Sequence, residues 1–545
     1  MPDSYIAYER EGKLTEKEFG ETYNDGIVTV AVSLKTDYID AKVAAAKRVT
    51  LRDVRVSFPY DFKKDDALLQ NGYQSWTDTM ELSCGDSQHD LNRLPGFVKK
   101  KLALESYGDY GFVDYSNKRG VFNGHTYAYI RRGAVFTLFG SLNENDGFTV
   151  ITFDTADGKV TLRKDVDGMT AEGECVLLNV GVYCGSEDDV FDRWFSDMDI
   201  SPTSARAVRG YTSWYNFYQN IDENKITTAL DSCRDMDVFQ IDDGYESAVG
   251  DWLVPDEAKF PRGMAKMAEL IHGRGMTAGI WIAPFVCEKK SRIFTEHKDW
   301  LVKDDNGRPI KAGHNWGGSY ALDVQNPAVL DYTARVILNA VNDWGFDLLK
   351  LDFLYTAAIK PSGGKTRGRV MRDMMEFLRQ LMGDKLMLAC GVPLASAFGI
   401  ADYCRIGTDV SLDWQNKPYI RALHREHAST KMSLYNTMFR RQLDGRAFLN
   451  DPDVFILRDD NNSLTYDQRQ TLSFVNNLLG SLIFTSDDTE AYGANARKTY
   501  EQHKLLASAS VKHIERRGDT VEIVYVCSGG ERKTVIDMDR GMILK

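Results

Sequence analysis

Short runs of β-branched and aromatic residues, with alternating apolar and polar positions, dominate residues 1–204. VTLRDVRVSFPY and ECVLLNVGVYCG are two of these runs, and Gly, Asp and Asn residues separate them from their neighbours. A period of two is typical of strands with one buried face, and many short strands divided by turn residues favour a sandwich. The pattern therefore predicts an N-terminal antiparallel β-sandwich domain over 1–204.

From residue 205 onward the pattern changes to apolar strands that alternate with amphipathic helices. One helix begins with Asn326 as its N-cap and Pro327 in its first turn, where these residue types are favoured. Eight strands are predicted, at 208–215, 237–244, 277–285, 347–355, 385–392, 403–407, within 446–457 and at 481–488. Repeated β-then-α units imply a parallel sheet, and eight units predict a (β/α)8 TIM barrel over 205–509. Short strands then return and predict a small C-terminal β domain over 510–545.

Composition and charge narrow the class of protein. The chain has 545 residues, of which 43% are hydrophobic and 27% charged, and a formal net charge of −12. This composition is typical of a soluble protein with several domains, and the acidic excess argues against nucleic acid or an anionic membrane as partner. No signal peptide, long apolar run or CxxC pair is present. We expect a cytoplasmic protein that acts on a small molecule without a cofactor or bound metal, and its oligomeric state stays open.

Charged residues gather at the carboxyl ends of the predicted barrel strands, where barrel enzymes place their chemistry. Asp242 and Asp243 follow the second strand, Lys350 and Asp352 lie in the fourth, and Asp409 follows the sixth. Residues two apart on a strand point to the same side, so Lys350 and Asp352 share a face. A buried structural ion pair between these two residues would also explain them, because an unpaired core carboxylate is costly. The recurrence of charge at several strand ends favours a functional site.

Aromatic residues lie at or near the same loops and strand ends. The set is Trp76, Trp214, Tyr215, Trp252, Trp281 and Trp414. Sugars stack their C–H faces on such rings and present hydroxyls to charged side chains. Two carboxylates without a metal cluster or a phosphate loop suggest cleavage of a glycosidic bond, with one as nucleophile and the other as acid and then base. Asp352 would have to stay ionised, which the neighbouring Lys350 favours.

Six segments of the predicted barrel carry a combined signature. They are SWYNFYQNI (213–221), FQIDDGY (239–245), GIWIAPF (279–285), LLKLDFLY (348–355), LACGVPL (388–394) and CRIGTDV (404–410). As a set they resemble the α-galactosidases of glycoside hydrolase family 36, and the resemblance extends over essentially the whole chain. It implies the same three-part architecture and the retaining hydrolysis of terminal α-linked galactose from oligosaccharides through a covalent glycosyl-enzyme intermediate.

The resemblance also implies the reacting groups and the residues that hold the sugar. Asp352, in the K-x-D-F strand, would be the nucleophile, and Asp409, in R-I-G-x-D, the acid/base. Asp242 and Asp243 would hold the O4 and O6 hydroxyls, and Lys350 would contact the O3/O4 side.

Four further residues are implied around the rest of the sugar. Cys390 and Arg405 would lie near O2. Trp214 would line the sugar pocket, and Trp76, in NGYQSW, would be the tryptophan that the N-terminal domain lends to the site.

Two positions depart from the family pattern and keep alternatives open. Val392 replaces the serine that often precedes P-L, and Thr408 stands where many members have proline. Val392 is expected near O2, so α-N-acetylgalactosaminidase activity remains an alternative, as does transglycosylation through the same intermediate. A metal-dependent barrel isomerase is a third reading, but it would need three converging carboxylates. The third and fifth strands end at Ala283 and Cys390 instead.

Overall fold

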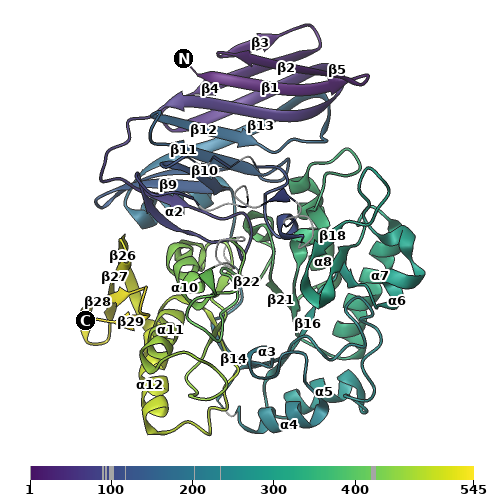
Figure 1. Cartoon of the computed structure of the whole chain (residues 1–545), viewed down its shortest axis with the longest axis vertical. Coiled ribbons are helices and arrows are strands. Elements are labelled where there is room, and N and C mark those ends of the chain that lie inside the picture. Colours follow the sequence, from purple (N-terminus) through teal and green to yellow (C-terminus); the bar gives the residue numbers. More distant parts are fainter. Residues whose placement is uncertain are drawn as a thin grey trace.

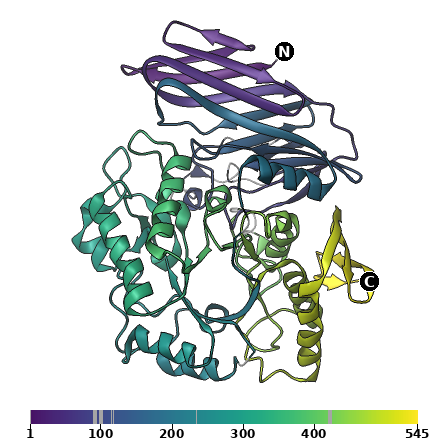
Figure 2. The same cartoon turned by 180° about the vertical axis from the view of Figure 1, so that it is seen from behind.

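Two large sheets organise the computed structural model. It describes residues 2–544 apart from 89, 90, 92–94, 97, 99–102, 114, 117, 202, 234 and 419–424. An antiparallel sheet formed by the N-terminal part lies across one end of a curled parallel sheet, whose helices lie on the outside (Figures 1 and 2). A small sheet at the C-terminus lies beside these helices. None of the described helices combines the length and apolar character needed to cross a membrane.

The N-terminal sheet has thirteen antiparallel strands that enclose a common core. They are β1 (Asp3–Arg10), β2 (Lys13–Phe19), β3 (Thr22–Asn24), β4 (Val28–Leu34), β5 (Tyr38–Pro59), β6 (Ala67–Gln70), β7 (Met80–Ser83), β8 (Val121–His125), β9 (Tyr127–Arg132), β10 (Val135–Ser141), β11 (Thr149–Asp154), β12 (Lys159–Lys164) and β13 (Thr170–Gly185). The long β5 pairs with β1, β4, β12 and β13 and so joins the parts of the sheet. Leu82 from one end of the strand order and Phe122 from the other belong to one buried cluster. The predicted antiparallel strands are confirmed.

The central sheet is parallel throughout and contains every strand that the sequence predicts there. Its strands are β14 (Val208–Thr212), β15 (Val238–Ile241), β16 (Thr277–Ile282), β20 (Leu348–Leu351), β21 (Leu386–Ala389), β22 (Tyr403–Arg405), β23 (Leu449–Asp451), β24 (Val454–Phe455) and β25 (Leu482–Thr485). The order is β23-β22-β21-β20-β16-β15-β14-β25-β24. β23 and β24 are the two ends of this order, and yet only Pro452 and Asp453 separate them along the chain.

Helices follow most of these strands. They are α3 (Trp214–Phe217), α4 (Glu223–Asp231), α5 (Gly263–His272), α6 (Arg292–Glu296), α7 (Pro327–Leu338), α8 (Arg367–Met382), α10 (Thr430–Phe439), α11 (Tyr466–Leu479) and α12 (Ala494–Lys504). Helix α2 (Glu187–Asp197) leads from β13 toward β14. The Asn326 side chain accepts a hydrogen bond from the Ala328 backbone and Pro327 opens α7, so the predicted start of this helix is confirmed.

Strand β20 shows how the sequence pattern positions a site. All four of its residues are buried, which is typical of a parallel strand covered on both faces. The prediction of a strand as far as residue 355 is wrong, because β20 ends at Leu351 and Phe353 adopts a left-handed backbone conformation with φ of 54°. Asp352 therefore lies just beyond the carboxyl end of the strand.

Two small sheets complete the fold. β17 (Val286–Glu288), β18 (Lys311–Gly313) and β19 (Ser319–Ala321) form an antiparallel sheet between β16 and β20 in the chain. β26 (Ser510–Arg517), β27 (Thr520–Cys527), β28 (Gly530–Asp537) and β29 (Met542–Ile543) form the C-terminal sheet. The Thr471 hydroxyl of α11 donates to the Gly541 carbonyl at 3.0 Å, so the C-terminal strands are tied to the central region.

Candidate active site

A cavity of about 330 Å³ lies at the carboxyl edge of the parallel sheet. Seven of the nine predicted site residues line it: Trp76, Trp214, Asp242, Asp243, Lys350, Asp352 and Asp409. Cys390 and Arg405 are buried behind its wall, at 1% and 2% exposure, and burial raises the pKa of the Cys390 thiol well above its usual range. The structure thus brings together residues that are 333 positions apart along the chain, from Trp76 to Asp409.

The Asp352 carboxylate is fixed through both of its oxygens. Trp281 Nε1 donates to Oδ2 at 3.0 Å, and the Phe353 backbone N–H donates to Oδ1 at 2.8 Å. The Asp352 backbone N–H in turn donates to the Ile282 carbonyl of β16 at 2.9 Å. The left-handed turn at Phe353 is an uncommon conformation for a bulky residue, and it presents the carboxylate to the cavity.

Lys350 pairs with Asp242 rather than with Asp352. Its Nζ donates to Asp242 Oδ2 at 2.8 Å, and both side chains are buried. Burial disfavours the Lys350 ammonium, but the charges of Asp242 and Asp352 outweigh this and raise its pKa above the usual value. An ion pair between Lys350 and Asp352 does not explain this site, because the Lys350 ammonium of β20 binds Asp242, which follows β15.

Asp243 lies next to Asp242 and is held by several donors. Gln219 Nε2 donates to its oxygens at 3.1 and 2.9 Å, and Trp316 Nε1 donates to Oδ2 at 2.9 Å. Burial raises the pKa of Asp243, against hydrogen bonds from Glu246 and Trp316. Burial and the Asp243 charge raise the pKa of Glu246 well above its usual range, which favours the neutral form of Glu246 beside Asp243.

Asp409 reaches the cavity from the loop after β22. Its side chain keeps 45% of its surface exposed, and Arg405 Nη1 donates to Oδ1 at 2.9 Å. The enclosing protein removes water from the carboxyl and raises its pKa, whereas the charges of Arg405 and Lys350 oppose the rise and that of Asp352 adds to it. The expectation that the nucleophile's charge supports protonation of the acid agrees with this balance.

The N-terminal region delivers Trp76 through a tightly held segment. Arg440 is completely buried and its guanidinium donates to the carbonyls of Gly72, Gln74 and Ser75 at 3.0, 3.2 and 2.7 Å. The Trp76 ring lies 5.0 Å from that of Phe353. A fixed segment of this kind places a tryptophan from the loop between β6 and β7 against the end of β20.

Position 392 contacts the same N-terminal segment that carries Trp76. The Ser75 backbone N–H donates to the Val392 carbonyl at 3.0 Å, and the Val392 N–H donates to Ser75 Oγ at 3.2 Å. The Val392 side chain is fully buried and is not among the described residues that line the cavity. The departure at this position therefore lies at the contact with the Ser75 segment rather than in the cavity wall.

Sequence reasoning found only part of the aromatic wall. Trp76, Trp214 and Trp281 line the cavity, but Trp414 donates through Nε1 to the Met538 carbonyl in the C-terminal region at 2.9 Å. Trp316 was missed, although it lines the cavity and has a left-handed backbone with φ of 55°. The two glycines after it, in HNWGG, are the signal that marks its loop as a tight turn.

Other cavity residues were not predicted from the sequence as site residues. They are Tyr107, His314, Asn315, Phe353, Thr408, Asn416, Glu426, His427 and Ala428. Glu426 for example accepts hydrogen bonds from Thr77 Oγ1 at 2.8 Å and from the Tyr110 hydroxyl at 3.0 Å. Only the packing of the N-terminal region against the central sheet brings such groups together.

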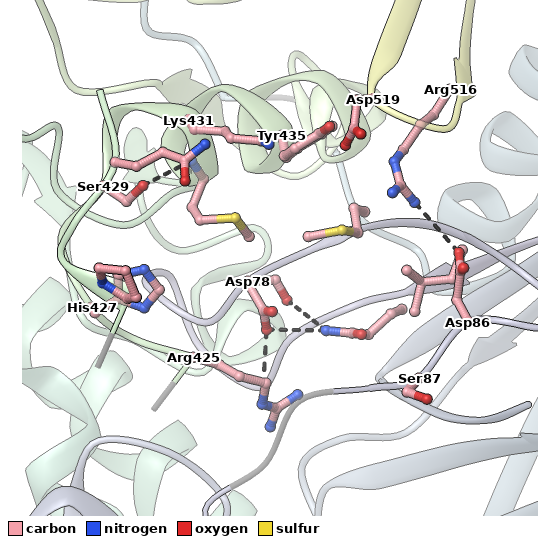
Figure 3. Close-up of a pocket in the computed structure, with 16 residues that line it drawn as sticks. Asp78, Asp86, Ser87, Arg425, His427, Ser429, Lys431, Tyr435, Arg516 and Asp519 are labelled. Carbon is pink, nitrogen blue, oxygen red and sulfur yellow. Dashed lines mark hydrogen bonds and ion pairs between the residues drawn. The ribbon is translucent and has the colours of Figure 1, made fainter. Parts of the chain in front are cut away.

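A second cavity, of about 570 Å³, lies between the N-terminal sheet, α10 and the β26–β27 turn. Figure 3 shows two ion pairs among the residues that line it, Asp78 with Arg425 and Asp86 with Arg516. These ion pairs join segments that are far apart along the chain, so this cavity lies where those segments pack together. The smaller cavity holds the convergent carboxylates and is the candidate active site.

Paired carboxylates at the carboxyl edge of a curled parallel sheet, beside aromatic rings, define the class of a glycoside hydrolase. Residues 208–378 match the protein-family model described as Melibiase. The structure is similar to that of TtGalA, an α-galactosidase from Thermus thermophilus in complex with p-nitrophenyl α-D-galactopyranoside. The similarity covers 94% of this chain and 98% of the TtGalA chain, with a TM-score of 0.72 and 27% sequence identity.

Further similarities agree with this class. The GH36 α-galactosidase AgaA of Geobacillus stearothermophilus shares the fold, with a TM-score of 0.60, 13% identity and coverage of 93% of this chain and 72% of that one. The chain is 32% identical over 166 residues to the A type blood α-D-galactosamine galactosaminidase of Flavonifractor plautii, a stretch covering 28% of this chain and 15% of that relative. It is also 25% identical over 162 residues to α-galactosidase 2 of Pediococcus pentosaceus, which is 28% of this chain and 22% of the relative. The chain thus matches well under two thirds of the length of these curated relatives.

These matches confirm the predicted resemblance to the α-galactosidases of glycoside hydrolase family 36. They also confirm the predicted class of enzyme, a glycoside hydrolase.

Proposed function

We propose that the protein is a retaining α-galactosidase that removes terminal α-linked galactose from oligosaccharides. The observation that carries the proposal is the pair of cavity carboxylates: Asp352 with both oxygens fixed, and Asp409 partly exposed beside Arg405. Solved structures of similar proteins support the substrate class, since TtGalA is described in complex with stachyose and AgaA in complex with raffinose.

The proposed reaction has two steps. Asp352 attacks the anomeric carbon and forms a covalent galactosyl ester while Asp409 protonates the departing glycosidic oxygen. Asp409 then removes a proton from water, which attacks the anomeric carbon and releases Asp352. A retaining enzyme needs its two carboxyl groups about 5–5.5 Å apart, which is the separation we expect for this pair.

The remaining cavity residues hold the sugar in this proposal. Asp242 and Asp243 accept hydrogen bonds from the sugar hydroxyls, and Lys350 donates to one. Trp214 and Trp76 pack against the ring. Cys390 and Arg405 are proposed for the C2 side, which they would reach from behind the carboxylates.

The proposal extends to the architecture and location. We propose that the parallel sheet closes into a (β/α)8 barrel over 205–509, since two residues link the strands at its opposite edges and span at most about 10 Å. Domains over 1–204 and 510–545 would flank it. All eight cysteines are free thiols, which supports a reducing, cytoplasmic location.

The alternatives receive less support. The argument for α-N-acetylgalactosaminidase activity depended on Val392, whose side chain is buried away from the cavity. The alternative of a metal-dependent barrel isomerase gains no support from the similar proteins, because the solved structures that the chain resembles are those of α-galactosidases.

The experiment compares p-nitrophenyl α-D-galactoside with the corresponding N-acetyl-α-D-galactosaminide and follows the released sugar by NMR. We expect hydrolysis of the galactoside, with α-galactose as the first anomer formed. Hydrolysis of neither substrate would reject the activity. If β-galactose appeared first, the reaction would invert and the covalent intermediate would be wrong.

A further inference from the structure

One arginine, Arg405, contacts three carboxylates. Its Nη1 lies 2.9 Å from Asp409 Oδ1, its Nε 3.0 Å from Asp451 Oδ2, and its Nη2 2.8 Å from Asp453 Oδ1. Asp451 and Asp453 are completely buried, whereas Asp409 faces the cavity. Three negative charges around one positive charge are unfavourable away from water, so burial and the neighbouring carboxylates raise the pKa of Asp409 and of Asp453, whereas Arg405 opposes the rise at both.

The three carboxyls differ in the hydrogen-bond donors that support their ionised forms. Asp453 Oδ2 accepts from the Val410 backbone N–H at 2.8 Å and from the Tyr215 hydroxyl, in addition to the Arg405 contact at Oδ1. Asp451 Oδ1 accepts from the Asp453 N–H at 2.8 Å. Donors stabilise the ionised form of a carboxyl, and these two have more of them than Asp409, which has Arg405 alone among the described side chains. Asp409 therefore has the least hydrogen-bond support for its ionised form.

The backbone at Asp453 supports this arrangement. Its φ is 75°, a left-handed conformation that aspartate tolerates better than most residues. It lies between β23 and β24 and bonds the N–H of Val410, the residue after Asp409. Asp453 thus fixes the loop of the acid/base and also its electrostatic surroundings.

We propose that Asp453 is a positioning residue that acts through Arg405 to keep Asp409 protonated for the first step of the reaction. The proposal rests on the proposed role of Asp409. The Asp453 carboxylate competes with Asp409 for the single guanidinium, so that Arg405 cannot fully stabilise the Asp409 anion. Arg405 still contacts Asp409 through Nη1, so it stabilises the Asp409 anion when Asp409 acts as the base in the second step.

The other charged groups around Asp409 and Asp453 determine in which direction the pKa of Asp409 moves when the Asp453 charge is removed. Asp409 also faces Lys350, which favours its anion, and Asp352 and Asp242, which oppose it. Asp453 faces Arg405, Asp409, Asp451 and Tyr215. Burial raises the pKa of Asp453 to about 7 and also raises that of Asp409. Without the negative charge of Asp453, Arg405 and Lys350 stabilise the Asp409 anion more strongly. Asp409 therefore loses its proton at a lower pH.

The test is the pH dependence of kcat/KM for Asp453→Asn on two substrates, stachyose and p-nitrophenyl α-D-galactoside. The basic limb on stachyose reports the proton of the acid, because a sugar leaving group needs protonation. We expect this limb to move to lower pH by about one unit, with no movement for the nitrophenyl substrate, whose leaving group needs little acid. An unmoved limb on stachyose, or equal losses on both substrates at every pH, would overturn the proposal.

A second variant covers the case in which Asp453→Asn does not fold. Tyr215→Phe removes one donor from Asp453, which makes Asp453 easier to protonate, so the same limb should move in the same direction by less. The matched control is Asp487→Asn, which removes another fully buried, arginine-paired carboxylate, bound to Arg458, Leu457 and Tyr492. It should lower the melting temperature without moving the limb.

Asp409→Asn separates this inference from the proposed function. If Asp409→Asn removes the basic limb on stachyose but Asp453→Asn leaves it in place, the function stands and the positioning role is rejected. If Asp409→Asn keeps the wild-type profile, Asp409 is not the acid and the proposed mechanism fails first.

Discussion

The end of β20 and the loop after β22 each present one carboxylate to the same cavity, and the protein holds them differently. Asp352 is 7% exposed and is bound by two uncharged donors, the Trp281 indole and the Phe353 backbone. Asp409 has a side chain that is 45% exposed and bound to the charged Arg405, which is shared with two further aspartates. Directional neutral donors fix the position of a group, whereas a balance of charges sets its protonation. A nucleophile needs a fixed position, whereas an acid/base needs a controlled protonation state.

The largest effect is expected at the fixed carboxylate. Asp352→Ala removes the proposed nucleophile, so kcat/KM should fall about 10⁴-fold or more on every α-galactoside. Steady-state rates on p-nitrophenyl α-D-galactoside and on stachyose measure this. Azide should restore part of the nitrophenyl rate and give β-galactosyl azide, because it enters from the vacated face. A wild-type rate would remove Asp352 from the mechanism.

The charge-balanced carboxylate should give a substrate-dependent effect. For Asp409→Ala we expect kcat/KM on stachyose to fall about 10²–10⁴-fold, the usual contribution of a general acid. On the nitrophenyl galactoside kcat/KM should change little, whereas kcat should fall because the second step still needs a base. Equal losses in kcat/KM on the two substrates would show that the two carboxylates do not have distinct roles.

The smallest effect concerns the support of Asp352. Trp281→Phe keeps an aromatic ring in the cavity but removes the indole donor to Oδ2, so kcat/KM should fall roughly tenfold on both substrates, as for one lost hydrogen bond to a charged group. Trp252→Phe is the matched control, because Trp252 packs edge-on against Trp281 at 5.4 Å and its Nε1 has no hydrogen-bond partner among the residues that the structure describes. A similar loss in this control would attribute the effect to packing.

The strand ends show how far sequence patterns reach. Lys350 and Asp352 were predicted to share one face because a strand has a period of two, and both line the cavity. The sequence left an ion pair between them open as an alternative, but Lys350 binds Asp242, 108 positions away. Periodicity specifies the face of a side chain but not the partner that a neighbouring strand brings to it.

The amino-acid sequence by itself determined the order of strands and helices, the carboxylates at the strand ends and the family resemblance. These features depend on local periodicity, on turn residues and on motifs of a few residues. The tertiary structure alone decided that Arg440 fixes the Trp76 segment, that Trp316 closes over Asp243, and that Arg405 is shared by three aspartates. Each of these contacts joins residues of different elements, and packing of the two large sheets brings them together. The protonation of Asp409 depends on such long-range neighbours, because the electrostatic environment of a buried carboxyl is set by whatever charges lie around it in space.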